Sequence, residues 1–453
     1  MSERADVVVI GMGPGGESVA GRLAEAGLDA VGVDSGLVGG ECPYWGCIPS
    51  KMMIRAANLV AETRRVPGMA GTSTVQPSWE PVARRIRDEA TDDWDDRVAV
   101  ERFEGKGGRF LRGAGRVVGP GRVEVGDVVV EAGRAIVLAT GTDASIPPVD
   151  GLRDVPYWTN HEAIEVAELP ASIVVLGGGA VGVELGQVFN RFGVEVTVVE
   201  ALDRLLAGEE PEAGALIAEM LEREGVSVRT SAKVTRVRED GATIAVELEG
   251  GSRAAGERLL VATGRTADVR ALGVDSIGVD PAARWLPVDD HLRVAPGVWA
   301  VGDITGKGAF THVAMYQAGI VVDDVLGRDV APADYKALPR VTFTDPEVGA
   351  VGLSEAQARE RGLDVRVGVA KVPSTARGWI HKAGNEGFIK LVEDARRGVL
   401  VGATSAGPAG GDVLGLLALA VHAEVPTAHL RRMIFAYPTF HRGVEDALRH
   451  MAH

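Results

Sequence analysis

Cysteine is scarce in this sequence, because only Cys42 and Cys47, five positions apart, carry a thiol among its 453 residues. A disulfide across so short a loop contributes little stability, since the entropic gain grows with loop length. A thiolate zinc site usually takes four ligands from Cys and His, and no His lies near this loop, so we expect no metal. We therefore expect the two sulfurs to serve redox chemistry rather than packing.

Long apolar runs and positive charge are also lacking. The stretch at 413–421 has half the length of about 18 residues that a membrane helix needs, and the first six residues lead into a strand without the features of a signal peptide. Lys and Arg total 48 against 63 Asp and Glu, and the net charge of −15 argues against nucleic acid or an anionic membrane as a partner. We expect a cytoplasmic protein, and in that reducing compartment a cysteine pair favours catalysis over structure.

Glycine, in contrast, is abundant, with 60 residues, which indicates tight turns and close approach of the backbone to ligands. An apolar strand at 6–10, a glycine turn and a helix at 17–26 follow one another, in the order that a dinucleotide-binding fingerprint requires. The first glycine permits the turn, the second lets the backbone approach a pyrophosphate, and the third allows the helix to pack closely on the strand. The glycines are Gly11, Gly13 and Gly16, and the next strand ends in Asp34, which can accept hydrogen bonds from a ribose.

The same pattern occurs again near the middle of the chain, with a strand at 173–176, a helix at 183–192 and a strand at 194–199. Its glycines are Gly177, Gly179 and Gly182, and its acid is Glu200. The middle glycine and the acid are 21 residues apart in both copies. Agreement of strand, glycines, helix and acid in both halves predicts two dinucleotide-binding domains.

The repeat extends beyond the glycine turns. Each copy ends in an apolar strand that runs into Ala-Thr-Gly, at 139–141 and 262–264, and contains a short alternating segment, at 122–130 and 243–248, that predicts an antiparallel meander. A chain of this length is expected to form two to four domains. Two such sites require two dinucleotides, most simply a flavin and a nicotinamide.

Together these motifs resemble the pyridine nucleotide-disulfide oxidoreductase family, which contains dihydrolipoamide dehydrogenase, glutathione reductase and mercuric reductase. The resemblance covers residues 7–448 and includes Gly-Gly-x-Cys-x4-Cys-Ile-Pro-Ser-Lys at 39–51, Trp-Ala-Val-Gly-Asp at 299–303, and a segment from Pro339 that is similar to the family's dimerisation domain. It implies an α/β fold with two Rossmann-like domains, for FAD and NAD(P), and a C-terminal α+β dimerisation domain. The implied limits are 1–148 and 269–336 for the FAD domain, 149–268 for the NAD(P) domain and 337–453 for the dimerisation domain.

The resemblance also implies roles for individual residues in a homodimer. Electrons would pass from NAD(P)H to FAD, then to the Cys42–Cys47 disulfide, and on to a disulfide or another two-electron acceptor. Lys51 would lie near the flavin and pair with Glu184, while Asp34 and Asp303 would hold the adenosine ribose and the ribityl chain of FAD. The further residues implied to bind the two dinucleotides are Gly115, Thr140, Gly141, Val234 and Gly264.

Position distinguishes the two sulfurs. Cys47 lies just before Pro49, and proline is favoured in the first turn of a helix, so the helix dipole should lower the pKa of the Cys47 thiol. Cys47 would then be the thiolate that faces the flavin, and Cys42, expected to be the more exposed, would attack the incoming disulfide. Glu200 favours NADH because its carboxylate would repel a 2′-phosphate, unless the nearby Arg204 turns inward.

One departure from the family pattern concerns the acceptor. Relatives carry His-Pro-Thr-x-x-Glu, supplied by the partner subunit, whereas this chain has Tyr437 and Arg442 at the His and Glu positions. A phenol exchanges protons poorly at pH 7, where imidazole does so readily. Either His441 replaces the missing base, or the acceptor needs no such base. A tyrosine here resembles mercuric reductase, but the chain ends at His453 without a C-terminal cysteine pair and begins without a metal-binding domain.

The sequence therefore predicts an NAD(P)H oxidoreductase with an unusual acceptor. The alternatives are a quinone or metal-ion reductase and, in another class, a flavoprotein redox sensor without turnover. Tyr44 and Trp45, between the cysteines, stand where relatives have small apolar or amide residues. Either Trp45 packs against the flavin or the core, or the two aromatics beside Cys42 shape an unusual substrate pocket.

Overall fold

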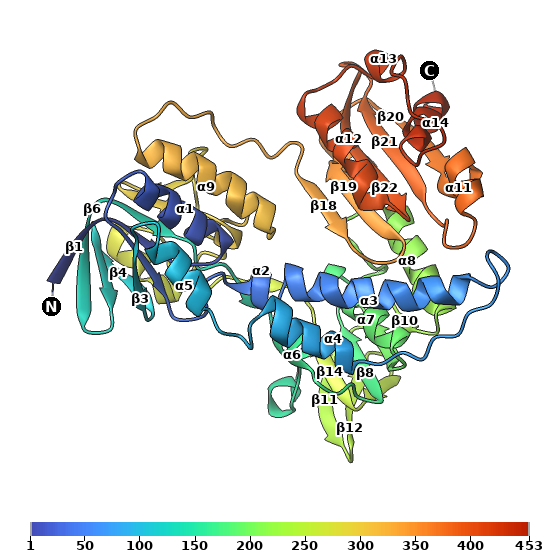
Figure 1. Ribbon diagram of the computed structural model, residues 1–453, viewed down its shortest axis with the longest axis horizontal. Coiled ribbons are helices and arrows are strands. Elements are labelled where there is room, and N and C mark those ends of the chain that lie inside the picture. The colour runs from blue at the N-terminus through green and yellow to red at the C-terminus, as the bar shows by residue number, and fades with distance from the viewer. Residues whose placement is uncertain (1, 452–453) are drawn as a thin grey trace. The chain divides into compact units, whose positions relative to one another are not determined.

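The computed structural model describes residues 2–451, so Met1, Ala452 and His453, including the end of the C-terminal tail discussed above, lie outside the described residues (Figure 1). The chain forms two compact units. The first consists of Met1–Ser50, Ala83–Ser145 and Arg265–Asp334, and the second of Lys51–Val82, Ile146–Gly264 and Tyr335–His453. Within residues 2–451, no helix has both the length and the apolar character needed to cross a membrane.

The first unit is built on an eight-stranded sheet with a parallel centre (Figure 1). Its strands are β1 (Ser2–Ile10), β2 (Ala30–Asp34), β3 (Arg109–Arg112), β4 (Gly115–Gly119), β5 (Arg122–Val125), β6 (Val128–Leu138), β16 (Arg293–Ala295) and β17 (Val298–Ala300). The order is β16-β17-β6-β1-β2-β3, and the hairpin β4-β5 joins the sheet through β6. The helices are α1 (Pro14–Glu25), α2 (Glu41–Tyr44), α5 (Arg97–Glu104) and α9 (Thr311–Val325), and β7 (Asp143–Ala144) pairs with β15 (Arg265–Thr266).

The central strand β1 is buried on both faces, which explains its continuous run of apolar residues. Side chains alternate across a strand, so Val7 and Val9 pack with Leu23 of α1, whereas Val8 and Ile10 pack on the opposite face with β4 and β5. Helices α1 and α9 lie side by side on the first of these faces (Figure 1). The sheet thereby fixes the glycine turn that follows β1.

The second unit repeats this plan with a smaller parallel sheet, in the order β10-β9-β8-β14. Its strands are β8 (Ser172–Leu176), β9 (Glu195–Val199), β10 (Ser227–Arg229) and β14 (Arg258–Val261), and its helices are α6 (Asn160–Glu165), α7 (Ala180–Arg191) and α8 (Pro211–Arg223). An antiparallel meander is formed by β11 (Val234–Asp240), β12 (Thr243–Leu248) and β13 (Arg253–Gly256). Both predicted meanders are confirmed, since β4, β5 and β6 are likewise antiparallel.

The C-terminal part of the second unit is an antiparallel five-stranded sheet with helices, in the order β18-β19-β22-β21-β20 (Figure 1). Its strands are β18 (Pro339–Thr342), β19 (Glu347–Gly352), β20 (Val365–Lys371), β21 (Phe388–Asp394) and β22 (Val399–Gly407). Its helices are α10 (Glu355–Glu360), α11 (Ala376–His381), α12 (Gly410–His422), α13 (Thr427–Leu430) and α14 (Arg442–His450). The two α/β sheets with parallel central strands and this α+β part confirm the predicted fold class.

Two helices carry the chain from one unit to the other, α3 (Cys47–Arg65) and α4 (Glu80–Arg85). Both fingerprint helices begin three residues earlier than the sequence predicted, at Pro14 and Ala180. In each case the second glycine of the motif, Gly13 or Gly179, is the N-cap. The glycine motif therefore forms the first helical turn itself, and its unpaired N–H groups lie at the end of the strand.

Candidate active site

The first glycine of each fingerprint makes a turn that other residues would not tolerate. Gly11 has a φ of +95° and Gly177 a φ of +109°. A Cβ on Gly11 would lie 2.5 Å from the carbonyl oxygen of Ala139, and one on Gly177 would collide with that of Ala262. Glycine alone satisfies both the positive φ and the close approach.

The second and third glycines differ in what surrounds them. A Cβ on Gly16 or Gly182 would collide with the carbonyl oxygen of the first glycine of its own motif, so these positions let the helix pack closely. Apart from its chain neighbours and its own helix, a Cβ on Gly179 would have no atom of residues 2–451 within 4 Å, and one on Gly13 would meet only the Cα of Gly40, at 4.0 Å. Open space at a helix N-terminus with free N–H groups fits a pyrophosphate, so both turns fit a dinucleotide.

The acid that ends each second strand binds its own glycine turn. The carboxylate of Asp34 accepts a hydrogen bond from the N–H of Met12 at 2.6 Å, and that of Glu200 accepts one from Gly178 at 2.6 Å. Each acid also accepts a hydrogen bond from the N–H two residues further along the chain, at 2.8 and 2.7 Å. The two copies therefore agree in detail, and each carboxylate stands beside its turn, where a ribose would meet it.

The other residues implied to bind the dinucleotides lie at strand ends. Thr140 and Gly141 follow β6, and the N–H of Thr140 borders the glycine turn at Gly11. Gly115 is the first residue of β4 and Val234 the first of β11. In the second unit, Gly264 follows β14 with a φ of +129°.

Asp303 lies beyond β17, at the start of a short 3-10 helix. Its carboxylate accepts a hydrogen bond from the hydroxyl of Thr142 at 3.2 Å, and Arg265 in turn donates to that hydroxyl at 2.8 Å. Burial raises the pKa of Asp303, while the positive charge of Arg265 and the bond from Thr142 oppose this. The side-chain oxygen of the buried Gln317 accepts a hydrogen bond from the N–H of Gly302 at 2.6 Å and so stabilises the turn before Asp303.

The two cysteines occupy successive helix starts. Cys42 lies within the one-turn helix α2, and Cys47 is the first residue of α3, which places Pro49 in the first turn as predicted. The expectation that Cys42 is the more exposed is wrong, because Cys47 is exposed and Cys42 is half-buried. Tyr44, in the same short helix as Cys42, is 6% exposed.

The thiols interact with each other and with Thr311. A hydrogen bond with Cys47 and burial both raise the pKa of Cys42, although the Thr311 hydroxyl partly opposes them. The Sγ of Cys47 lies 3.5 Å from the hydroxyl oxygen of Thr311, the first residue of α9. Sequence reasoning missed Thr311, which lies 264 residues from Cys47 and belongs to no local motif.

The predicted pair of Lys51 and Glu184 is formed within the second unit. The ammonium of Lys51 lies 2.8 Å from the carboxylate of Glu184, whose side chain is 7% exposed. The other carboxylate oxygen of Glu184 accepts the N–H of Phe343 at 2.7 Å, and the Lys51 Nζ lies 4.7 Å from the centre of the Phe343 ring. A half-buried ammonium is thus held by a carboxylate and an aromatic face.

Tyr437 and His441 both lie just before the last helix, α14. Tyr437 is 68% exposed, and the guanidinium of Arg442 lies 5.3 Å from the centre of its ring. His441 is the N-cap of α14 and is half-buried. Arg442 also pairs with Glu445 at 2.9 Å, so the tyrosine has a cation behind it where the family pattern has an anion.

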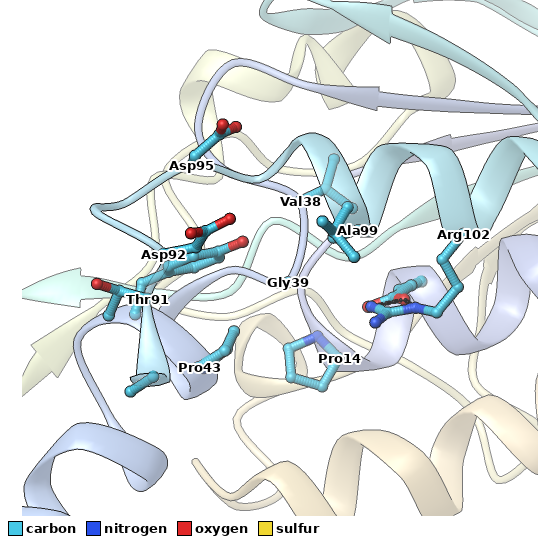
Figure 2. Close-up of a pocket in the computed structure, with 13 residues that line it drawn as sticks. Pro14, Val38, Gly39, Pro43, Thr91, Asp92, Asp95, Ala99 and Arg102 are labelled. Atoms are coloured by element: carbon cyan, nitrogen blue, oxygen red, sulfur yellow. Dashed lines mark hydrogen bonds and ion pairs between the residues drawn. The ribbon is translucent and has the colours of Figure 1, made fainter. Parts of the chain in front are cut away.

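A pocket of about 420 Å³ lies beside the cysteine loop in the first unit (Figure 2). Figure 2 shows Pro14 and Pro43 next to one another, with Asp92 on one side and Arg102 on the other. Tyr44 also lines this pocket while its ring remains buried. Tyr44 therefore packs in the interior and also borders a cavity.

Comparison with known proteins gives a consistent result. The family described as "Pyridine nucleotide-disulphide oxidoreductase" matches residues 5–318, and its dimerisation domain matches residues 338–448. The dihydrolipoyl dehydrogenase of Thermus scotoductus is 33% identical over 461 residues, which cover 98% of this chain and 96% of that protein. The mercuric reductase of Bacillus cereus is 30% identical over 450 residues, which cover 98% of this chain and 71% of that protein.

Solved structures agree with the sequence relatives. The HOCl-induced flavoprotein disulfide reductase RclA from Escherichia coli matches with a TM-score of 0.86 at 25% identity, covering 98% of this chain and 99% of that one. The resemblance inferred from the motifs is thereby confirmed. The chain belongs to the pyridine nucleotide-disulphide oxidoreductase family and is an oxidoreductase that uses FAD and a pyridine nucleotide.

Proposed function

We propose that the protein transfers two electrons from NADH, through Cys42 and Cys47, to a disulfide or another two-electron acceptor, without a histidine base on the acceptor side. The observation that carries this proposal is the environment of the cysteine pair. Cys47 begins α3 and faces the first residue of α9, while the pKa of Cys42 is raised by Cys47 and by burial. This arrangement favours a thiolate at Cys47 and a retained proton at Cys42.

Each sulfur has its own step in the exchange. Bound FAD would supply a hydride acceptor for the pyridine nucleotide and a two-electron donor for the cysteine pair. Cys42, once deprotonated, attacks one sulfur of the acceptor disulfide, and the other acceptor sulfur leaves as a thiolate. The thiolate of Cys47 then attacks Cys42, re-forms the Cys42–Cys47 disulfide and releases the first acceptor sulfur. The proton of Cys42 and one proton from solvent convert the two acceptor sulfurs to thiols.

The remaining residues have supporting roles in this proposal. Lys51 and Glu184 serve the hydride transfer, and Asp34 and Asp303 hold FAD. The FAD domain comprises 1–148 and 269–336, the NAD(P) domain 149–268 and the dimerisation domain 337–453. The last of these exposes 75% of Trp379 and 96% of Ile434, and apolar exposure of this kind supports a homodimer in which a second copy covers it.

The choice of NADH is assigned to Glu200. Its carboxylate, anchored by the glycine turn, would repel a 2′-phosphate. Arg204 does not neutralise it, because its guanidinium binds the Asp203 carboxylate at 3.3 Å and the carbonyl of Ala207 at 2.9 Å. The Glu200 carboxylate can therefore accept hydrogen bonds from both hydroxyls of the NADH ribose, whereas NADPH carries a phosphate in place of one of them.

Replacing Glu200 by alanine should lower kcat/KM for NADH by about tenfold, the loss expected for hydrogen bonds to a charged group. Activity with NADPH should fall less or rise, because the repulsion is removed. Steady-state rates with both nucleotides measure the ratio. Glu195→Ala, at the exposed first residue of β9, the strand that leads to Glu200, is the control and should change neither. A wild-type preference for NADPH would contradict the assignment.

Thr311 should support the thiolate of Cys47. Thr311→Val removes the hydroxyl 3.5 Å from that sulfur, so the thiolate should lose a hydrogen-bond donor and form only at higher pH than in the wild type. The measurement is the pH midpoint of the long-wavelength absorbance that a thiolate gives beside oxidised flavin. Thr311→Ser keeps the hydroxyl and should keep the wild-type midpoint, whereas equal midpoints in all three proteins would remove Thr311 from the proposal.

A second candidate function is quinone or metal-ion reduction. Two observations favour it: the exposed Tyr437 in place of the base, and the likeness to mercuric reductase and to RclA, which is also known as a Cu(II) complex. A screen of disulfides, quinones and metal ions with the NADH-reduced enzyme distinguishes the candidates. Disulfide turnover that is lost in Cys42→Ser supports the proposal, quinone turnover that persists in this variant supports the alternative, and no turnover of any acceptor would favour a sensor.

A further inference from the structure

Helix α3 carries a polar seam, which we define as Lys51, Asn58 and Arg65. The three residues are seven positions apart, or about two helical turns, so they lie on one face of the helix. Each bonds to a residue far away in the sequence. The partners are Glu184 for Lys51 at 2.8 Å, Arg191 for Asn58 at 2.6 Å and Asp345 for Arg65 at 2.7 Å.

Helix α7 presents the matching face, with polar side chains at positions 184, 187 and 191. All three bind the segment that follows β18. Glu184 accepts the N–H of Phe343 at 2.7 Å, and Gln187 binds both the N–H of Asp345 at 2.8 Å and its carbonyl at 3.0 Å. Arg191 pairs with the Asp345 carboxylate at 2.8 Å. Two helices and one loop segment are therefore joined by a continuous polar network, and α3 and α7 lie side by side in Figure 1.

Arg191 and Asp345 form the centre of this network. The side chain of Arg191 is 1% exposed and also binds Glu224 through two hydrogen bonds, at 2.9 and 2.6 Å. Asp345 pairs with Arg65 as well as with Arg191. A buried guanidinium that loses a carboxylate partner is strongly disfavoured, so this contact holds Asp345 in one place.

The position of Asp345 affects Lys51 through Phe343. The ring of Phe343 contacts the Lys51 ammonium, and its N–H binds the carboxylate that holds this ammonium. A shift of the segment therefore moves the cation and the carboxylate together. Small displacements of reacting groups slow chemistry strongly, since rates depend on positions held to within about an ångström.

We propose that Asp345 and Arg191 are positioning residues for the Lys51–Glu184 pair, so that a site remote from the chemistry controls hydride transfer. This inference rests on the proposed function, in which Lys51 serves that transfer. Asp345→Asn keeps the size of the side chain and removes its charge from Arg191 and Arg65. We expect the rate constant for flavin reduction by NADH, measured per bound flavin in rapid-mixing experiments, to fall about tenfold, with the KM for NADH unchanged.

Two further variants test whether the effect depends on the contact between Arg65 and Asp345. Arg65→Gln, at a side chain that is 20% exposed, should lower the same rate by a smaller factor without endangering the fold. Glu62→Gln removes the other, surface-exposed partner of Arg65 and is the matched control, with no expected change. A purely structural role would lower the thermal midpoint and leave the rate per bound flavin as in the wild type, which would overturn the inference.

A double-mutant cycle separates this inference from the proposed function. Lys51→Met should itself slow flavin reduction, and Asp345→Asn should then have no further effect, because it acts through Lys51. If Lys51→Met leaves the rate unchanged, the proposed role of Lys51 is wrong. If Lys51→Met slows reduction but the two changes multiply, Lys51 keeps its role and the positioning by Asp345 is refuted.

Discussion

Cys47→Ser should reduce NADH-dependent disulfide reduction by at least about a thousandfold, the scale on which loss of an essential nucleophile acts. The reason is that a serine hydroxyl stays protonated at neutral pH. The Cys47 thiol, in contrast, lies at the start of α3 and beside Thr311 at the start of α9, and this position favours a thiolate. The flavin should remain bound, because the glycine turn at Gly11 and the acid at Asp34 are untouched. Anaerobic titration with NADH should then reduce the flavin without the long-wavelength absorbance of a thiolate beside it.

Cys42→Ser provides the contrast, because it removes the attacking sulfur and leaves the thiolate of Cys47. This variant should also lose disulfide turnover, yet keep the long-wavelength absorbance. Without Cys42 no disulfide can form, so Cys47 keeps a free thiol in the oxidised enzyme and the absorbance should be visible without prior reduction. Absorbance that survives in Cys47→Ser, or that is absent from the NADH-reduced wild type, would refute the cysteine mechanism.

What the sequence predicted correctly depends on whether a signal is local. The glycine turns at Gly11 and Gly177 were predictable because strand, turn and helix follow one another within about 20 residues. The pairing of Lys51 with Glu184 came only from the resemblance, since 133 residues separate them. Thr311 was missed for the same reason, because only the folded chain brings α9 to the head of α3.

Dependence on tertiary structure also explains the wrong prediction about the cysteines and the late recognition of the polar seam. The relative exposure of the two cysteines was predicted in the wrong order, because exposure depends on packing in the folded chain, where Cys42 is half-buried and Cys47 exposed. The seven-residue spacing of the polar seam on α3 is visible in the sequence, but it has no meaning there without α7. Spacing identifies a face of a helix, and only tertiary structure identifies what that face binds.

Tyr437→His combined with Arg442→Glu should give the enzyme activity toward lipoamide or glutathione disulfide, raising kcat/KM by about a hundredfold over the wild type. An imidazole takes and returns a proton near pH 7, and a carboxylate behind it holds its orientation. Glu445 loses Arg442 in this variant but retains Arg449, so the first turn of α14 keeps an ion pair. Initial rates with each disulfide, at fixed NADH, measure the gain.

The pH dependence identifies where the gain comes from. In the wild type, the raised pKa of Cys42 means that its thiolate fraction grows with every pH unit below that pKa, so disulfide reduction should rise steadily from pH 6 to pH 9. A histidine base removes this requirement, and the double variant should show a flatter profile with its largest gain near pH 7. Tyr437→Phe should behave as the wild type, since the phenol is not expected to move a proton. A gain in Tyr437→Phe as large as that of the double variant would mean that the tyrosine only blocks access, and that the missing base does not limit the reaction.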